Sequence, residues 1–347
     1  MLHSLQSFLI LSWLATSPGP SLSGCASTTV KSTVFSFGGL ICSTGSSAAW
    51  RAGAVPRTHR SVVDDLWKFQ HEKWSKVTAI DKNPPKRMYS AAATDQKNEN
   101  IYIFGGWDPG RGSVGSFLND VWKFCLANNT WEELASLPYP VSRHSACTIG
   151  EKIVIHTLKG TIIFEDDELK VQETTGDNPN DLSMCAVAEN GTHLILFGGN
   201  TRNHTMSNEL YLLDTKTWNW IQMKQEGDIP CKRAGCNICK SKEGFLLFGG
   251  GTTGERGYEG GKGLIGLSDT YIVNIEENLA KWKKIDKGYM DPGPRVVPTL
   301  ETVNDAIYLH GGWNPESMET YQDTWIFYED YYDFSTAYID QYMKYLR

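Results

Sequence analysis

The sequence predicts an all-β protein in which six four-stranded sheets close into a ring, a six-bladed β-propeller. Three observations lead to this prediction. A short apolar run that ends in two glycines recurs along the 347 residues. Each copy is followed by an acidic residue and an aromatic-led strand, and most copies carry a further tryptophan. Glycine (33 residues), tyrosine (15) and tryptophan (12) are abundant, as expected of short strands joined by tight turns.

The repeated motifs occur in the same order in each unit. The double glycine ends FSFGG (35–39), YIFGG (102–106), LILFGG (194–199), LLFGG (246–250) and YLHGG (308–312). The acidic and aromatic strands are DDLWKF (64–69), NDVWKF (119–124), NELYLL (208–213), SDTYIV (268–273) and QDTWIF (322–327). The second tryptophan is Trp74, Trp131, Trp218 or Trp282. Proline and arginine then open the next unit in PPKR (84–87), PVSR (140–143), PCKR (230–233) and PGPR (292–295).

This pattern resembles the kelch repeat, and the resemblance covers nearly the whole chain. It implies that the run before the glycines is a buried inner strand, and that the glycines turn the backbone where strands crowd toward the axis. The two aromatic residues are expected to fill the space between neighbouring blades. A sixth, degenerate unit occupies residues 142–175. There LKG (158–160) replaces the double-glycine motif, Phe164 stands in the aromatic strand, and the later tryptophan is missing.

The last unit lacks its fourth strand, and the N-terminal segment is predicted to supply it. Residues 8–16 contain an apolar run and Trp13, and prolines follow, as at the other blade junctions. The rival interpretation is a secretory signal peptide, although a basic n-region is absent. A closing strand predicts a cytoplasmic protein, whereas a signal peptide predicts a secreted one. The blades are expected at residues 24–80, 87–137, 142–175, 181–225, 232–286 and 295–330 plus 8–16.

The propeller domain is therefore placed at residues 8–330, and residues 331–347 form a C-terminal tail. Phe334, Tyr338 and Tyr342 recur at intervals of four in this tail, which predicts a short helix. The net charge of −7 argues against nucleic-acid binding, and no run of 18 apolar residues predicts a membrane span. The cysteines fall mainly in predicted inner strands, so neither a metal site nor a cofactor is expected.

The loops after the double glycines share one face of the ring with the blade junctions, and we expect ligand binding there. Kelch propellers that bind peptides use similar positions. The resemblance thus implies a basic, aromatic-rimmed mouth that holds an acidic or polar segment of a partner protein, with the chain acting as a monomeric scaffold. Ion pairs with loop acids such as Glu255 or Glu316 are the alternative for each junction arginine. The predicted partner-binding residues are Arg51, Arg57, Arg60, Trp107, Arg111, Arg143, Arg233, Arg256, Tyr258, Arg295 and Trp313.

Catalytic motifs give little support to an enzyme. The glycine-rich run GERGYEGGKG lacks the Lys followed by Ser or Thr of a P-loop, and no G-x-S-x-G elbow is present. In the E-x3-D-x3-H iron pattern of some kelch proteins, Phe327 stands where histidine is needed. The sequence therefore favours a non-enzymatic interaction module. The alternative left open is a kelch-type carbohydrate-acting enzyme such as a sialic acid epimerase, because its arginine-lined mouth is compatible with this sequence.

Overall fold

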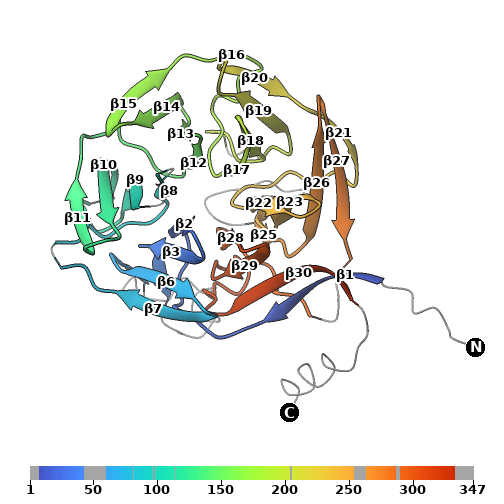
Figure 1. Cartoon of the computed structure of the whole chain (residues 1–347), viewed down its shortest axis with the longest axis horizontal. Coiled ribbons are helices and arrows are strands. Elements are labelled where there is room, and N and C mark those ends of the chain that lie inside the picture. Colours follow the sequence, from blue (N-terminus) through green and yellow to red (C-terminus); the bar gives the residue numbers. More distant parts are fainter. Residues whose placement is uncertain are drawn as a thin grey trace, which may run out of the picture.

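The computed structural model describes residues 8–42, 60–253 and 263–332, apart from residues 81, 96, 98, 114, 204 and 287–289. Within this part, six sheets surround a central axis like the blades of a propeller (Figure 1). Every blade has four antiparallel strands, and blades 4 and 5 each gain a fifth, parallel strand at their outer edge. The predicted six-bladed all-β propeller is confirmed. None of the described residues forms a helix long and apolar enough to cross a membrane.

The strands of each of the first three blades follow one another in chain order from the inner to the outer strand. Blade 1 contains β2 (Ala26–Val30), β3 (Thr33–Phe37), β6 (Leu66–Gln70) and β7 (Lys73–Val77). Blade 2 contains β8 (Ala91–Thr94), β9 (Asn100–Asp108), β10 (Ser116–Cys125) and β11 (Thr130–Glu133). Blade 3 contains β12 (Ser145–Ile149), β13 (Lys152–Thr157), β14 (Gly160–Glu165) and β15 (Glu168–Gln172).

The other three blades add strands from elsewhere in the chain. Blade 4 contains β17 (Ala186–Asn190), β18 (His193–Phe197), β19 (Leu210–Asp214), β20 (Asn219–Gln222) and β16 (Thr175–Gly176). Blade 5 contains β22 (Asn237–Ser241), β23 (Gly244–Phe248), β26 (Thr270–Glu276), β27 (Leu279–Ile285) and β21 (Lys224–Gly227). Blade 6 contains β28 (Thr299–Val303), β29 (Ala306–His310), β30 (Thr324–Tyr332) and β1 (Phe8–Ala15). Two short hairpins, β4 (Leu40–Cys42) with β5 (Arg60–Val62) and β24 (Gly251–Thr253) with β25 (Leu264–Gly266), extend blades 1 and 5.

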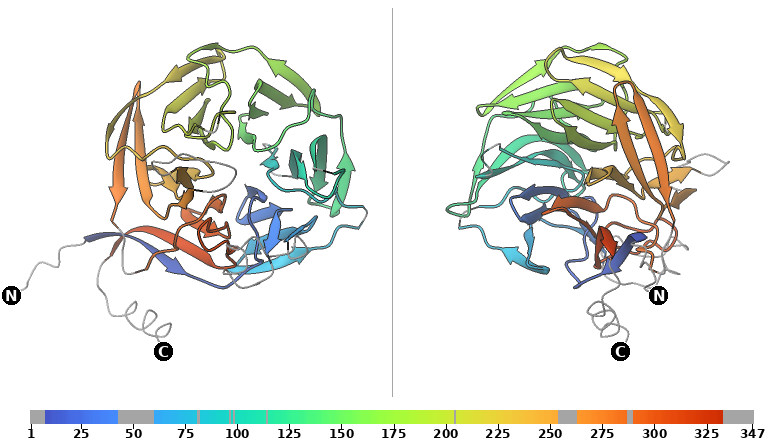
Figure 2. Two further views of the ribbon diagram at one scale, coloured as in Figure 1. Left: turned by 180° about the vertical axis from the view of Figure 1, so that it is seen from behind. Right: turned by 45° about the vertical axis from the view of Figure 1, so that its right-hand side comes forward.

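The N-terminal strand closes the ring, as the strand count predicted. β1 pairs with β30 over eight residues, from Phe8 opposite Tyr332 to Ala15 opposite Trp325. Figure 2 shows these two strands, from opposite ends of the chain, lying side by side at the edge of the last blade. β30 continues to Tyr332, and the predicted C-terminal helix lies outside the described residues.

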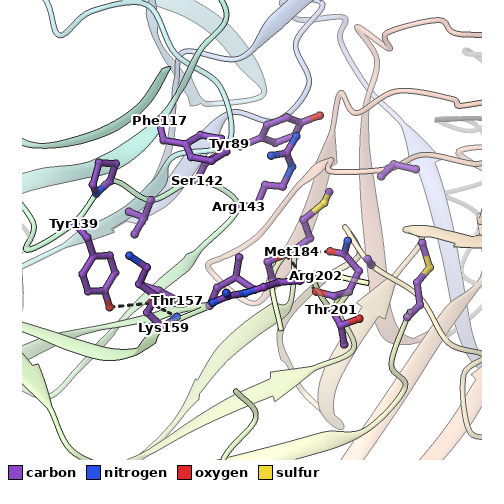
Figure 3. A pocket seen from close by; sticks show the side chains of 18 of the residues that line it. Tyr89, Phe117, Tyr139, Ser142, Arg143, Thr157, Lys159, Met184, Thr201 and Arg202 are labelled. Atoms are coloured by element: carbon purple, nitrogen blue, oxygen red, sulfur yellow. Dashed lines mark hydrogen bonds between the residues drawn. The ribbon is translucent and has the colours of Figure 1, made fainter. Parts of the chain in front are cut away.

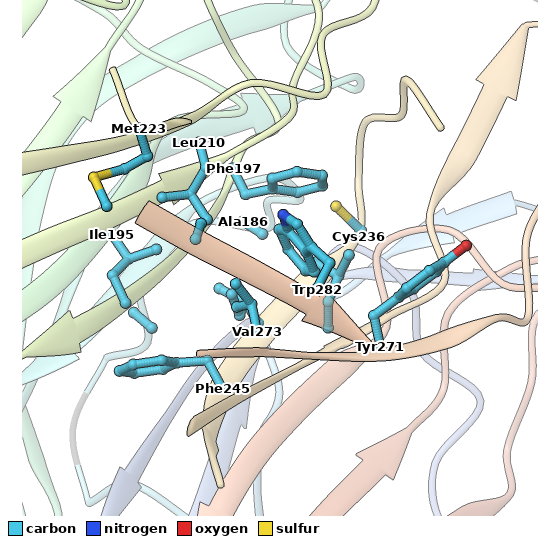
Figure 4. Close-up of a cluster of buried hydrophobic side chains, with 14 of the residues drawn as sticks. Ala186, Ile195, Phe197, Leu210, Met223, Cys236, Phe245, Tyr271, Val273 and Trp282 are labelled. Carbon is cyan, nitrogen blue, oxygen red and sulfur yellow. The ribbon is translucent and has the colours of Figure 1, made fainter. Parts of the chain in front are cut away.

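Aromatic wedges join neighbouring blades, as the repeat pattern predicted. Trp282 of blade 5 packs against Phe197 of blade 4, with ring centroids 4.9 Å apart, inside a continuous apolar cluster (Figure 4). In blade 4 this wedge is Trp220, whose ring meets His156 of blade 3 at 5.6 Å. The interpretation of Trp218 as the wedge is therefore wrong, because Trp218 lies in the preceding turn with a positive φ of 57°.

Three buried histidines are expected to make the fold sensitive to acid. Burial lowers the pKa of His144, His156 and His310 to about 4, below the ordinary value near 6.5. The unfolded chain therefore takes up these protons first, and the free energy of unfolding should decrease as the pH falls from about 6.5 to about 4. Glu301 and Glu329, whose pKa values are raised by burial, act in the opposite direction. The test must consequently compare variants with the parent protein.

We expect His156→Phe to flatten this pH dependence. His156 faces Ser145 in the register where Phe104 faces Ala91 in blade 2, so a phenyl ring suits the position. Urea unfolding of parent and variant at pH 7.5, 6 and 5 measures the effect. The variant should lose less stability than the parent over this range. Parallel stability curves would contradict the assignment of His156 as an acid-sensitive group.

Candidate ligand-binding site at the propeller mouth

Six backbone hydrogen bonds encircle the axis at the face that carries the long loops. One residue from each blade takes part, and its N–H donates to the carbonyl of the residue in the preceding blade, at N···O distances from 2.7 to 3.3 Å. All six residues have left-handed backbone conformations, with φ from +47° to +64°. We call this set the central ring. Its members are Gly24, Tyr89, Arg143, Met184, Gly235 and Val297.

The central ring separates the junction arginines into two kinds. Arg143 is a ring member, whereas Arg87, Arg233 and Arg295 lie two residues before their ring members and are fully buried. Each buried guanidinium forms a two-pronged ion pair with an aspartate of its own blade, at N···O distances of 2.6 to 3.1 Å. The prediction that Arg233 and Arg295 line an accessible mouth is therefore wrong, since their donors face the protein interior.

The partner of each buried arginine is the acidic residue of the repeat motif. Asp120, Asp269 and Asp323 pair with Arg87, Arg233 and Arg295, respectively, instead of the loop acids considered above. Burial opposes ionisation of these carboxyls, but the arginines' hydrogen bonds and charge hold their pKa values below the ordinary value. An aromatic residue two positions later also donates to the same carboxylate, so the motif forms one structural unit. Blades 1 and 4 have Leu22 and Leu182 in place of the arginine.

The remaining predicted site residues fall into three groups. Arg51, Arg57, Arg256 and Tyr258 lie outside the described residues, as does the side chain of Arg60, the first residue of β5. Trp107 in β9 and the exposed Arg111 belong to the long β9–β10 hairpin and do not line the cavity at the mouth. Of the predicted site residues whose side chains the structure describes, Arg143 and Trp313 are the two that line that cavity.

This cavity has a volume of about 700 Å³ and lies off the axis, mainly above blades 2, 3 and 4. Figure 3 shows Tyr89, Arg143 and Met184 of the central ring on one side and Tyr139 and Lys159 on the other. Phe117, 55% exposed, lines it from β10. Most of its lining side chains are aromatic or aliphatic, a composition typical of ligand sites.

The degenerate third blade leaves room for this cavity. β13 ends at Thr157 and β14 begins at Gly160, so only Leu158 and Lys159 connect them. Blades 1, 2 and 5 have much longer connections at the equivalent position, and in each a pair of strands extends the connection. Long connections of blades 1, 2 and 5 therefore extend the face that carries the mouth, whereas blade 3 contributes only a short turn there.

Two cations in the cavity are seated on aromatic rings. The Arg143 guanidinium carbon lies 4.6 Å from the ring centroid of Tyr89, and Lys159 Nζ lies 4.5 Å from that of Tyr139. Tyr139 is itself oriented by a hydrogen bond of 3.1 Å between its hydroxyl and Thr157 Oγ1. Among the described residues, no carboxylate pairs with either cation and none lines the cavity. Arg202, a third lining cation, pairs with Asp181 at 2.9 Å.

Comparison with known proteins agrees with these features, which define a kelch-type propeller. A family model described as the KLHDC2/KLHL20/DRC7 Kelch-repeats domain matches residues 24–158 and 161–338. The chain therefore belongs to the Kelch-repeat family. The match is interrupted at the two residues 159–160, in the short turn of blade 3 that opens the cavity.

Three individual proteins that resemble this chain share less than a quarter of its residues over the matched region. Kelch domain-containing protein 10 of Xenopus tropicalis is 23% identical over 262 residues, covering 67% of this chain and 61% of that protein. The human protein of the same name is 22% identical, with 67% and 56% covered, so the chain spans less than two thirds of these relatives. A solved structure described as "Structure of YjhT" has a TM-score of 0.65 at 15% identity, covers 89% of this chain and 95% of its own, and shares the fold.

Proposed function

We propose that the protein is a non-enzymatic interaction module whose cavity holds an acidic segment of a partner protein. The observation that carries the proposal is the pair of cations, Arg143 and Lys159, in a largely apolar cavity without a neighbouring carboxylate among the described residues. An unpaired guanidinium stacked on an aromatic ring is well arranged for carboxylate binding. Membership of the Kelch-repeat family supports the general role, because such propellers typically bind proteins.

Reversing both charges should weaken this binding strongly. A hydrogen bond to a charged group contributes about 1.5–3 kcal/mol, so the loss of two should weaken binding at least about a hundredfold. A phage-displayed library of random 12-residue peptides, selected on the full chain, provides the ligand. We expect Asp and Glu to be enriched, and the selected peptide to bind Arg143→Glu/Lys159→Glu at least about a hundredfold more weakly by fluorescence polarisation.

The matched control is Lys73→Glu/Lys216→Glu, which makes the same change in charge at exposed positions on the outer strand of blade 1 and in a turn of blade 4. Its affinity should stay within about twofold of the parent at 150 mM salt, since distant exposed charges are screened. Equal losses in both double variants would exclude a site at the mouth. Turnover of a sialic acid that disappears in the mouth variant alone would favour the enzyme alternative.

A further inference from the structure

The central ring contains side chains where glycine would be less strained. Gly24 and Gly235 have φ of 63° and 64°, which glycine adopts readily. Tyr89, Arg143 and Met184 have φ between 56° and 58°. A residue with a side chain is destabilised in this conformation, and such strain collects at functional sites. The fourth such ring member is Val297, with φ of 47°.

Three of these four strained residues line the cavity. They are Tyr89, Arg143 and Met184, which follow one another around the ring from blade 2 to blade 4. Val297 does not line this cavity. It lines a smaller one of about 110 Å³, to which all six members of the central ring contribute. Strain therefore coincides with the cavity at three positions, and Val297 provides an internal comparison.

The ring glycines make room for two of these side chains. A Cβ atom at Gly24 would lie 3.0 Å from a ring carbon of Tyr89. One at Gly235 would lie 3.2 Å from Met184 Cε, and closer still to Cγ1 of Val296 (2.8 Å) and of Val297 (3.1 Å). Tyr89 and Met184 thus lie close to the two glycines, on either side of Arg143 in the order of the ring. The guanidinium lies over the Tyr89 ring, and Met184, the next ring member, lines the same cavity. A carboxylate that reaches Arg143 must therefore bring its neighbouring groups into a cavity with apolar side chains.

We infer that Tyr89, Arg143 and Met184 are specificity-determining residues, retained despite backbone strain because they select an acidic residue adjacent to a large apolar one. This inference rests on the proposed function and specifies its ligand. Arg143 binds the carboxylate, and Tyr89 and Met184 contact the apolar neighbour. An unbranched methionine side chain adapts to apolar groups of different shape, so leucine and phenylalanine should both be accepted.

Binding is tested with short acetylated and amidated peptides of glycine and serine that contain one Asp next to Gly, Leu or Phe. The Leu and Phe peptides should bind the parent protein at least about tenfold more tightly than the Gly peptide, as expected when an apolar side chain is buried. Met184→Gly should reduce this preference to within about threefold, whereas Val297→Gly should retain it. Arg143→Gly should remove the preference for Asp over Asn.

Thermal unfolding provides the second readout. Arg143→Gly and Val297→Gly should each raise Tm by about 1–3 °C, because glycine relieves the left-handed strain. A lower Tm for Arg143→Gly alone would show that Arg143 is structural and would overturn the inference. Binding that requires the Asp of the peptide but shows no preference for Leu or Phe would also overturn the inference, while leaving the proposed function intact. Binding that is independent of the Asp would reject both.

Discussion

Removal of residues 1–16 is expected to lower Tm by more than about 10 °C, or to leave the chain insoluble. The deletion takes away β1, which pairs with β30 over eight residues, and exposes the edge of β30. It also removes Trp13, which is 7% exposed and donates from Nε1 to Thr270 Oγ1 at 3.0 Å. The loss of one such tryptophan typically costs about 3–5 kcal/mol.

Trp13 connects two blades, so its loss should affect more than one sheet. Its ring lies 5.2 Å from that of Phe248 in blade 5 and 5.1 Å from that of Phe327 in blade 6. Trp13→Phe retains β1 and most of the apolar contact, and it should therefore cost less than the deletion. Differential scanning calorimetry of the three proteins measures this order. A truncated chain that melts within about 2 °C of the parent would contradict the closing role of β1.

The segment after β1 holds the closure by a second contact. His310 Nε2 donates to the carbonyl of Pro20 at 2.9 Å, and Nδ1 lies 3.0 Å from Thr324 Oγ1. Trp74 Nε1 of blade 1 donates to the same threonine hydroxyl at 2.9 Å. Blades 1 and 6 and the N-terminal segment thus meet in one hydrogen-bonded network, so residues after β1 also contribute to closure.

Features that repeat in the sequence could be predicted, because each blade provides an independent copy. The missing fourth strand of the last unit required β1, and the spaced aromatics correctly indicated inter-blade wedges such as Trp282. The arginine register could not be obtained from spacing alone. Arg143 follows its proline by the same interval as Arg233, but its neighbours place it two residues later relative to the central ring.

The absence of an acidic partner in blade 3 is the sequence feature that distinguishes Arg143 from the buried arginines. Arg233 and Arg295 are buried because each blade supplies an aspartate two residues before an aromatic side chain. Blade 3 lacks this pair, so an arginine at its junction had no partner with which to be buried. The cavity was missed for a related reason: it exists because the connection through Lys159 is short, and the absence of a loop leaves no motif in the sequence.

Breaking one of the buried arginine–aspartate pairs should have the second large effect. Asp269→Ala leaves the fully buried Arg233 guanidinium without a carboxylate, and it removes the acceptor of the Tyr271 hydroxyl. An uncompensated buried charge costs about 3–5 kcal/mol. Asp65→Ala is the matched control, because Asp65 precedes Trp67 as Asp269 precedes Tyr271 but pairs at 2.7 Å with the half-exposed Lys76.

The control should lose at most about 1 kcal/mol, as expected of an exposed pair. Replacing both partners by apolar residues, in Arg233→Met/Asp269→Leu, removes the unpaired charge and should recover much of the stability lost in Asp269→Ala. Urea unfolding of the parent and the three variants gives the free energies of unfolding to be compared. Binding of the selected peptide to the folded double variant should remain within about threefold of the parent, because Arg233 faces the interior. If the double variant regains stability but loses affinity about a hundredfold, Arg233 contributes to binding after all.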